Sequence, residues 1–393
     1  MRVAIDPYLR LLAAAALVVV VTGTVLDLSW LPLLVPAVGV LFAVGGAVAA
    51  AATDRAASAR ASVGRALTTL LLPFWLFAVA VVATMLTLGW SAAPFQGAEP
   101  FSWSTVWLWL FPISEPPASV EGTPWVLTAA FVPAYLWLTL ATPALLWLVR
   151  RWPLRLLAVP VLTVLLLTAG IVTLTGRARD VVLAVCVLGC CWGVGLARSA
   201  GTLPRVRPLV ALAAGGALLG SGLALALWRD VYPAGTVDDS PLTALLCSLG
   251  AVLLLLRVPW RGDRLRGGWP GTVVSAVGAR TMTVFLWAPA AAAAAVPALA
   301  LSPLAAYHTD DASGALLHYA TTWLLILVVV LLVGWAEDVG AGLWPTLLGG
   351  RRHERRRAAE LERTFVVRDN LVQGLPPAPL GPASEPAAAS LRR

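Results

Sequence analysis

Ten apolar segments follow one another along the chain, and the connections between them hold most of the charged residues before residue 336. Most of these segments approach the length of about 20 apolar residues that an α-helix needs to cross a bilayer. The predicted spans are residues 9–26, 30–52, 66–90, 125–149, 155–175, 180–197, 207–228, 241–256, 272–300 and 317–335. The pattern therefore predicts an all-α polytopic integral membrane protein with about ten transmembrane helices.

Two of these spans depart from an uninterrupted run of about 20 apolar residues. The eighth segment is the shortest, and Pro289 and Pro297 interrupt the ninth, where a proline can kink or break a helix. The first segment, an apolar run close to the N-terminus, is similar to a signal peptide. However, the next apolar run begins only a few residues later without a clear small-x-small cleavage site, so we expect the first segment to remain as a span.

The amino-acid composition also indicates that this chain lies in a lipid bilayer. Of its 393 residues, 59% are hydrophobic and only 12% are charged, which is more apolar surface than a soluble protein can bury. The 18 tryptophans cluster near the ends of the apolar runs, where an indole ring is favoured at the membrane interface.

The arginines predict the orientation of the spans. With the N-terminus inside, the outer connections hold only Arg177, Arg179 and Arg229. The inner connections hold Arg2, Arg10, Arg55, Arg60, Arg65, Arg150, Arg151, Arg155, Arg198, Arg205, Arg207, Arg257, Arg261, Arg264 and Arg266. The positive-inside bias thus predicts a plasma-membrane protein with both termini in the cytosol. Arginines at span ends can interact with anionic lipid headgroups, and this accounts for the net charge of +8. We therefore expect no nucleic-acid partner.

Two polar regions lie outside the spans. The outer connection 91–124 has no basic residue, and its run 103–113 holds Trp103, Trp107 and Trp109 but is too short to cross a bilayer. This run predicts a re-entrant or interfacial segment, or an ordinary aromatic anchor. We divide the chain into a transmembrane domain, residues 1–335, and a basic cytosolic tail, residues 336–393. In the tail, 351–368 is expected to form a basic helix on the inner leaflet, and 375–390 to be disordered.

The sequence excludes several chemistries. It has no phosphate-binding glycine loop, no zinc-binding histidine pair, no serine elbow and no lysine, which rules out a Schiff base on this polypeptide. The four cysteines lie inside apolar runs without histidine or carboxylate neighbours, and we therefore expect no metal and no disulfide framework.

Histidines supply the candidate general bases. His308 lies in a predicted outer loop close to Asp310 and Asp311, and His318 opens the last span. A histidine oriented by a carboxylate is the minimal general base, although loop histidines beside aspartates are common without any such role. His353, in the basic tail, is expected to be a surface residue.

Ionisable residues near span ends are a second group of candidates, because burying a charge in a bilayer is costly. Asp6, Arg10, Arg65 and Arg280 all fall on the predicted cytosolic side, where they could receive the phosphates of an acyl-CoA. The alternative is that Arg10 reaches the headgroups and Asp6 pairs locally.

Three further acidic residues lie near span ends. Asp180 could pair with Arg179 or face an outer cavity. Glu337 and Asp338, which end the tenth span, are interpreted as boundary residues.

Five stretches in a fixed order resemble one family. They are 41–52 (LFAVGGAVAAAA), 70–77 (LLLPFWLF), 135–153 (YLWLTLATPALLWLVRRWP), 179–201 (RDVVLAVCVLGCCWGVGLARSAG) and 280–290 (RTMTVFLWAPA). Over residues 1–335 this order resembles the actinobacterial branch of the integral-membrane acyltransferase 3 family. The resemblance implies ten core helices and the transfer of acyl groups onto envelope sugars or similar acceptors.

The chain departs from this family at three positions. The family places an arginine eleven residues before the first-span histidine that acts as general base on the acceptor hydroxyl, and the same count from Arg10 leads to Val21. Valine cannot accept a proton, and a base contributes typically about 10²–10⁴-fold to rate. Thr69 stands where the family usually has an arginine, and Ala288 where it has a histidine.

Three functional hypotheses follow. The first is a membrane acyltransferase-like protein that moves an acyl group from acyl-CoA to a hydroxyl of an envelope sugar or lipid, with weak, relocated or absent catalysis. Its candidate residues are the bases His308 and His318, the donor ligands Arg10, Arg65 and Arg280, and the supporting Asp6 and Asp180. The second is a non-catalytic scaffold or partner subunit, and the third is a transporter of lipid intermediates. The expected partners are membrane lipid, acyl-CoA as donor substrate and an envelope glycan or glycolipid, without a cofactor.

Overall fold

The computed structural model describes residues 6–28, 30–91, 100–228, 240–257, 268–305 and 312–345. The chain divides into two units, Val3–Gly349 and the terminal segments Met1–Arg2 with Gly350–Arg393. The second unit, with the predicted basic helix 351–368 and the region 375–390, lies outside the described residues. All regular elements within the described ranges are helices.

The described residues contain eight helices that are long and apolar enough to cross a membrane. They are α1 (Pro7–Leu26), α3 (Ala37–Arg55), α4 (Ala59–Thr87), α6 (Val132–Arg151), α8 (Gly176–Ser199), α9 (Pro208–Trp228), α12 (Thr281–Ala300) and α13 (Ala312–Val333). Two shorter apolar helices, α7 (Pro153–Thr168) and α10 (Pro241–Arg257), occupy the places of the fifth and eighth predicted spans. The structure confirms the predicted all-α polytopic membrane protein.

Short helices complete the described fold. They are α2 (Leu31–Leu34), α5 (Trp103–Val106), α11 (Gly268–Ala279) and α14 (Trp335–Gly340), together with the 3₁₀ turns η1 (Trp107–Trp109), η2 (Thr123–Trp125), η3 (Ala129–Phe131) and η4 (Leu203–Arg205). The helix α14 packs against α4. It therefore belongs to the helical bundle, although the predicted tail begins at residue 336.

Several predicted spans differ from the observed helices, among them the second, the third and the ninth. The second is divided at Pro36 into α2 and α3, because proline lacks the N–H that would continue the helix. The third begins at Ala59, since Ser58 caps it by accepting a hydrogen bond from the Ala61 N–H. The ninth is divided at Arg280, between α11 and α12, whereas both of its prolines lie inside α12.

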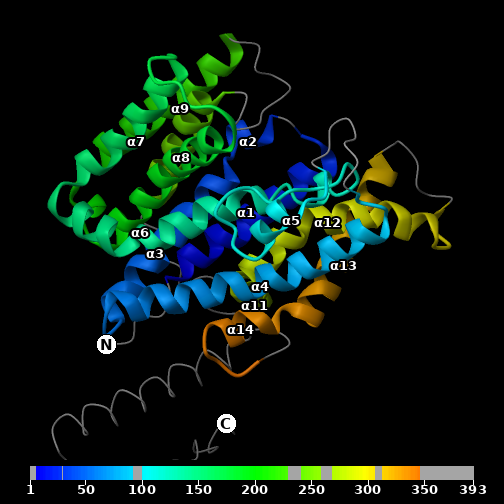
Figure 1. Cartoon of the computed structure of the whole chain (residues 1–393). Coiled ribbons are helices and arrows are strands. Elements are labelled where there is room, and N and C mark those ends of the chain that lie inside the picture. The colour runs from blue at the N-terminus through cyan, green and yellow to red at the C-terminus, as the bar shows by residue number, and fades with distance from the viewer. Residues whose placement is uncertain are drawn as a thin grey trace, which may run out of the picture. The chain divides into compact units, whose positions relative to one another are not determined.

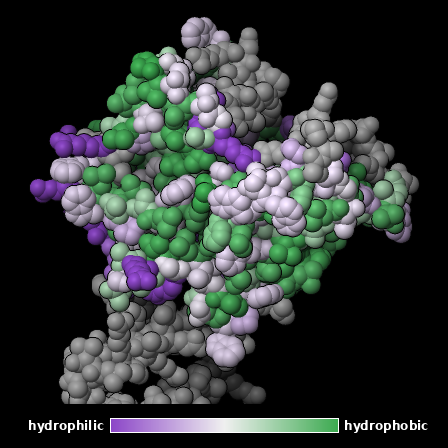
Figure 2. Space-filling model, in the orientation of Figure 1, coloured by the Kyte–Doolittle hydropathy of each residue, from purple (hydrophilic) through white to green (hydrophobic). Residues whose placement is uncertain are grey.

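One group of helices packs around two neighbours, α3 and α8 (Figure 1). The helix α8 contacts α3, α6, α7 and α10, and α9 lies on α10. The helix α1 contacts α3 on one side and α12 on the other, and α13 packs on α12. The first predicted span thus joins the α3–α8 group to the last helices of the chain. Figure 2 shows hydrophobic residues over much of one face and hydrophilic residues along its left edge.

Glycine allows the closest of these contacts. A Cβ added at Gly195 of α8 would overlap the carbonyl oxygen of Ala43, and one added at Gly46 of α3 would overlap that of Trp192. The two backbones therefore approach as closely as small residues permit in membrane helix pairs.

The segment between α4 and α6 is held by tryptophans. The indole N–H groups of Trp75 and Trp137 donate to the carbonyl oxygens of Leu110 and Ile113, over 2.8 and 3.1 Å. These bonds matter because a bilayer leaves backbone carbonyls without water. Trp109 is 4% exposed and stacks on Phe74, whereas Trp103 is 81% exposed. Of the three tryptophans in the predicted run 103–113, Trp109 is thus buried, whereas Trp103 and Trp107 are exposed.

Replacing Gly195 with alanine should destabilise the protein, because the added methyl group forces α8 away from α3. Overpacking of this kind typically costs about 1–3 kcal/mol. Thermal unfolding of the detergent-solubilised protein measures the effect. The matched control is Gly216→Ala on α9, where an added Cβ meets nothing within 4 Å. Equal melting temperatures for the two variants would contradict the close α3–α8 contact.

Candidate functional site

An apolar cluster lies where α1, α12 and α13 meet. Its buried members are Leu17, Val21, Val284, Phe285, Ala288, Ala291, Ile326 and Val330, here called the α1–α12 apolar cluster. Val21 and Ala288 are each 1% exposed. The two positions that the family resemblance assigns to histidines therefore belong to one cluster, and both are occupied by side chains that cannot transfer a proton.

His318 lies beside this cluster at the contact between α12 and α13. Its Nε2 is 2.9 Å from the carbonyl oxygen of Ala292, one helical turn along α12 from Ala288. Because a carbonyl only accepts, Nε2 carries the proton of this hydrogen bond, and the lone pair of the neutral ring then lies on Nδ1. The contact fixes both the tautomer and the orientation of the only histidine within the described residues.

A hydroxyl pair joins α1 to α13 next to the same cluster. The Thr22 hydroxyl donates to the carbonyl oxygen of Val18 over 2.8 Å and lies 3.2 Å from the Tyr319 hydroxyl. Since the Thr22 proton is already used, Tyr319 donates to Thr22. Thr22 and Tyr319 each directly follow a residue singled out above, Val21 and His318. Polar groups therefore adjoin the α1–α12 apolar cluster on both α1 and α13.

The break between α11 and α12 contains a buried ion pair. The Arg280 guanidinium lies 2.7 Å from the Asp338 carboxylate, and their side chains are 1% and 3% exposed. A Cβ added at Gly334 would lie 3.1 Å from the Arg280 Cδ, so the arginine side chain passes directly over that glycine. The interpretation of Asp338 as a boundary residue was wrong, because α14 turns back into the bundle and brings this carboxylate to Arg280.

Glu337 caps the start of α12 from a different helix. Its Oε1 accepts hydrogen bonds from both the backbone N–H and the hydroxyl of Thr283, each over 2.6 Å. Arg280, at the N-cap, makes no capping bond of its own. A carboxylate at a helix N-terminus satisfies an unpaired N–H and complements the helix dipole. Glu337 therefore fixes α14 to α12, and it too is not a mere boundary residue.

Glu337 lies in α14, outside the candidate spans. Burial raises the pKa of Glu337 to about 7 from its ordinary value of 4.5, although the bonds from Thr283 and the charge of Arg280 act to lower it. A pKa raised in the folded state means that the folded protein binds this proton more tightly than the unfolded chain. Its stabilising contribution is therefore complete below about pH 4.5 and is lost as the pH rises through about 7.

The predicted donor ligands lie in three different environments. Arg10 on α1 lies against Gly278 of α11, two residues before the buried Arg280. Arg65 is exposed on α4, where its Nε donates to the carbonyl oxygen of Ala61. The structure thus brings Arg10 and Arg280 to the α11–α12 junction but leaves Arg65 on another helix. Their role as phosphate ligands stays a prediction.

Asp6 is tied to other helices. It accepts a hydrogen bond from the Tyr8 N–H as the N-cap of α1 and forms an ion pair with Arg198 of α8 over 2.8 Å. The Tyr8 hydroxyl donates to the carbonyl oxygen of Leu255 on α10. These bonds hold the start of α1 against α8 and α10, which is a structural role for Asp6.

Asp180, His308 and His353 are the remaining predicted residues. Asp180 is exposed, 4.0 Å from Arg179 of the same helix. His308 and His353 lie outside the described residues. In the part of the chain that the structure describes, no three histidine, cysteine, aspartate or glutamate residues are grouped closely enough to hold a metal.

Replacing Asp338 with asparagine should strongly destabilise the protein, because the Arg280 charge would stay buried without its counter-charge. Breaking a buried ion pair on one side typically costs about 3–5 kcal/mol. Unfolding by denaturant in detergent measures the change. The control is Asp54→Asn in the half-exposed pair with Arg150, where about 0–1 kcal/mol is expected. An equally small loss for both variants would contradict the importance of the buried pair.

Replacing Glu337 with glutamine should flatten the pH dependence of stability. The wild-type protein should lose stability relative to this variant as the pH rises from about 4.5 to about 7, because the folded state then gives up a proton that it holds tightly. Unfolding free energies of both proteins across this range test the prediction. A constant difference between them would show that Glu337 does not titrate there.

No curated protein and no solved structure matches the chain. The family model of the acyltransferase 3 domain, described as an acyltransferase domain, matches residues 8–337. The match extends from the first turn of α1 to Glu337 in α14 and covers most of the 393 residues. The chain therefore belongs to the acyltransferase 3 family of membrane proteins.

Proposed function

We propose that this protein transfers an acyl group from acyl-CoA to a hydroxyl group of a cell-envelope sugar or lipid, with His318 as the general base. The observation that carries the proposal is the hydrogen bond between His318 and the Ala292 carbonyl oxygen. It orients an imidazole one helical turn from Ala288, beside the α1–α12 apolar cluster. Family membership supports the reaction class, and this contact supports the choice of base.

In the proposed reaction, the acceptor oxygen attacks the thioester carbonyl carbon of the donor. The hydroxyl proton passes to Nδ1 of His318, whose Nε2–H is held by Ala292. The carbon–sulfur bond then breaks, and the sulfur of coenzyme A leaves as a thiol after it takes up that proton. No cofactor is needed for this exchange of an ester for a thioester.

The donor would bind from the cytosol. The distribution of arginines supports a plasma-membrane protein with both termini on that side. Arg10 and Arg65 are proposed to receive the phosphates of acyl-CoA, together with Arg280, whose charge Asp338 already balances. The acceptor sugar or lipid would approach from the opposite side, which is the side of His318 in this orientation.

A second candidate function is a non-catalytic partner subunit of the envelope machinery. The observation that favours it is the full burial of Val21 and Ala288 in the α1–α12 apolar cluster, which leaves both expected histidine positions without a polar side chain. In that case the family fold would serve for binding a lipid or a protein partner.

The three histidines of the chain allow a matched test. The full-length protein in lipid nanodiscs is supplied with labelled acetyl-CoA or longer acyl-CoA and an envelope extract as acceptor. His318→Gln should lower the rate of acyl transfer by about 10²–10⁴-fold, because glutamine keeps a donor for the Ala292 carbonyl but cannot take a proton. Donor binding should stay unchanged, because His318 lies on α13, whereas the proposed phosphate ligands lie on α1, on α4 and at the start of α12.

His353→Gln serves as the control and should transfer at the wild-type rate. A larger loss in His308→Gln than in His318→Gln would reject His318 as the base. Absence of turnover by the wild-type protein with every donor would reject the enzymatic proposal and favour the partner subunit.

A further inference from the structure

The corner between α6 and α7 concentrates arginine and tryptophan at the surface. Trp147, Arg150, Arg151, Trp152 and Arg155 fall within nine consecutive positions, and all five are exposed. In Figure 2, hydrophilic residues gather at the left edge of the molecule, where Figure 1 shows the ends of α6 and α7. Exposed tryptophans beside cations at the end of a spanning helix are typical of the depth of lipid headgroups.

The aromatic rings of this corner hold one of its arginines in place. Trp147 and Trp152 meet edge to face, with their ring centroids 5.9 Å apart. The Arg155 guanidinium lies 5.2 Å from the centre of the Trp152 ring. A guanidinium over an indole face keeps its outer edge available for hydrogen bonds. The Trp152 ring therefore holds the Arg155 side chain in one orientation before a ligand binds. This reduces the conformational entropy that the side chain would lose on binding.

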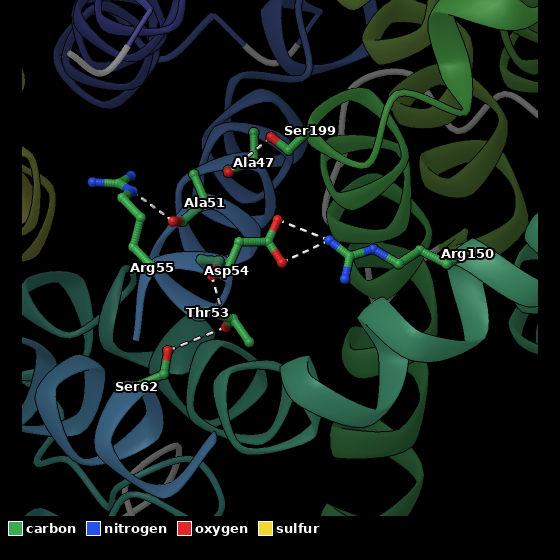
Figure 3. A network of polar contacts seen from close by, with 9 residues as sticks. Ala47, Ala51, Thr53, Asp54, Arg55, Ser62, Arg150 and Ser199 are labelled. Carbon is green, nitrogen blue, oxygen red and sulfur yellow. Dashed lines mark hydrogen bonds and ion pairs between the residues drawn. The ribbon is translucent and has the colours of Figure 1, made fainter. Parts of the chain in front are cut away.

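Arg150, in contrast, forms an ion pair within the protein. Its guanidinium lies 2.6 and 2.8 Å from the two carboxylate oxygens of Asp54, at the end of α3 (Figure 3). This contact joins α6 to α3. A bond between the Thr53 and Ser62 hydroxyls, 3.1 Å apart, joins the same end of α3 to α4. The Asp54 carboxylate is thus occupied by Arg150, and neither Arg151 nor Arg155 has an ion pair within the described residues.

We propose that the α6–α7 corner, formed by Trp147, Arg151, Trp152 and Arg155, binds the phosphate group of an anionic membrane lipid. Charge complementarity supports this ligand, because two exposed guanidinium groups with no acidic partner among the described residues suit a phosphodiester with hydrogen bonds as well as charge. The exposed indole rings place the corner at the interface, where such a phosphate lies. The site is separate from the acyl-transfer residues, since none of them belongs to α6 or α7.

The test compares lipids on the full chain in detergent. Native mass spectrometry measures the affinity for phosphatidylglycerol and for phosphatidylcholine as each is titrated. The wild-type protein should bind phosphatidylglycerol more tightly, because phosphatidylcholine carries a positive group that balances its phosphate. The Arg151→Gln/Arg155→Gln double variant should lose this preference, with a fall in phosphatidylglycerol affinity of about fivefold for each arginine removed.

The matched control is Arg205→Gln/Arg207→Gln, which removes two exposed arginines from the connection between α8 and α9. No ring contact of these two is found among the described residues. The control should keep the preference of the wild-type protein. An equal loss in both double variants would overturn the proposal, since net charge alone would then explain the binding.

Two further measurements keep the proposal testable if the glutamine variant does not fold. The Arg151→Lys/Arg155→Lys variant keeps both charges and should bind phosphatidylglycerol more weakly than wild type, because lysine cannot form the paired hydrogen bonds of a guanidinium. Inorganic phosphate at matched ionic strength should not displace the lipid from the wild-type protein. Wild-type affinity in the lysine variant, or displacement by inorganic phosphate, would overturn the lipid site.

Discussion

Arg280 and Asp338 bury opposite charges against each other at the point where α11 ends and α12 begins, and the arrangement of the last helices depends on that contact. A buried arginine is costly in a bilayer unless a partner lies beside it, so α14 must return to the bundle to supply Asp338. The return of α14 also brings the preceding residue, Glu337, to the start of α12, where it accepts a hydrogen bond from the Thr283 N–H. With α12 held in place, its contacts with α1 and α13 determine which side chains meet in the α1–α12 apolar cluster.

The length of the apolar runs predicts the helices but not their interruptions. Each apolar run of sufficient length produced a helix, because the bilayer requires that backbone groups be satisfied within the segment. The break at Arg280 could not be predicted from the run itself, since it depends on a carboxylate 58 positions later in the chain. The start of α4 was missed because the apolar pattern begins after the polar first turns that Ser58 caps.

The candidate site was predicted in part. His318 was singled out as a base, but its bond to Ala292 depends on how α12 and α13 pack, which no local pattern shows. Glu337 and Asp338 were judged to be boundary residues because they follow the last apolar run. The sequence did contain a signal for the ion pair: two acidic residues directly follow the last apolar run, and Arg280 lies inside an earlier predicted span. Val21 and Ala288 were noted separately, and only the packing brings them into one cluster.

Placing a histidine at position 21 tests the central proposal most directly, namely that the proton passes to His318 and not to a residue of the α1–α12 apolar cluster. Acyl-CoA turnover is measured for Val21→His in the His318→Gln background and compared with the wild-type protein. The account predicts no recovery, because the buried members of this cluster are apolar and an imidazole among them would lose the water that stabilises its charged form. Recovery of turnover would contradict it and return the catalytic position to the first span.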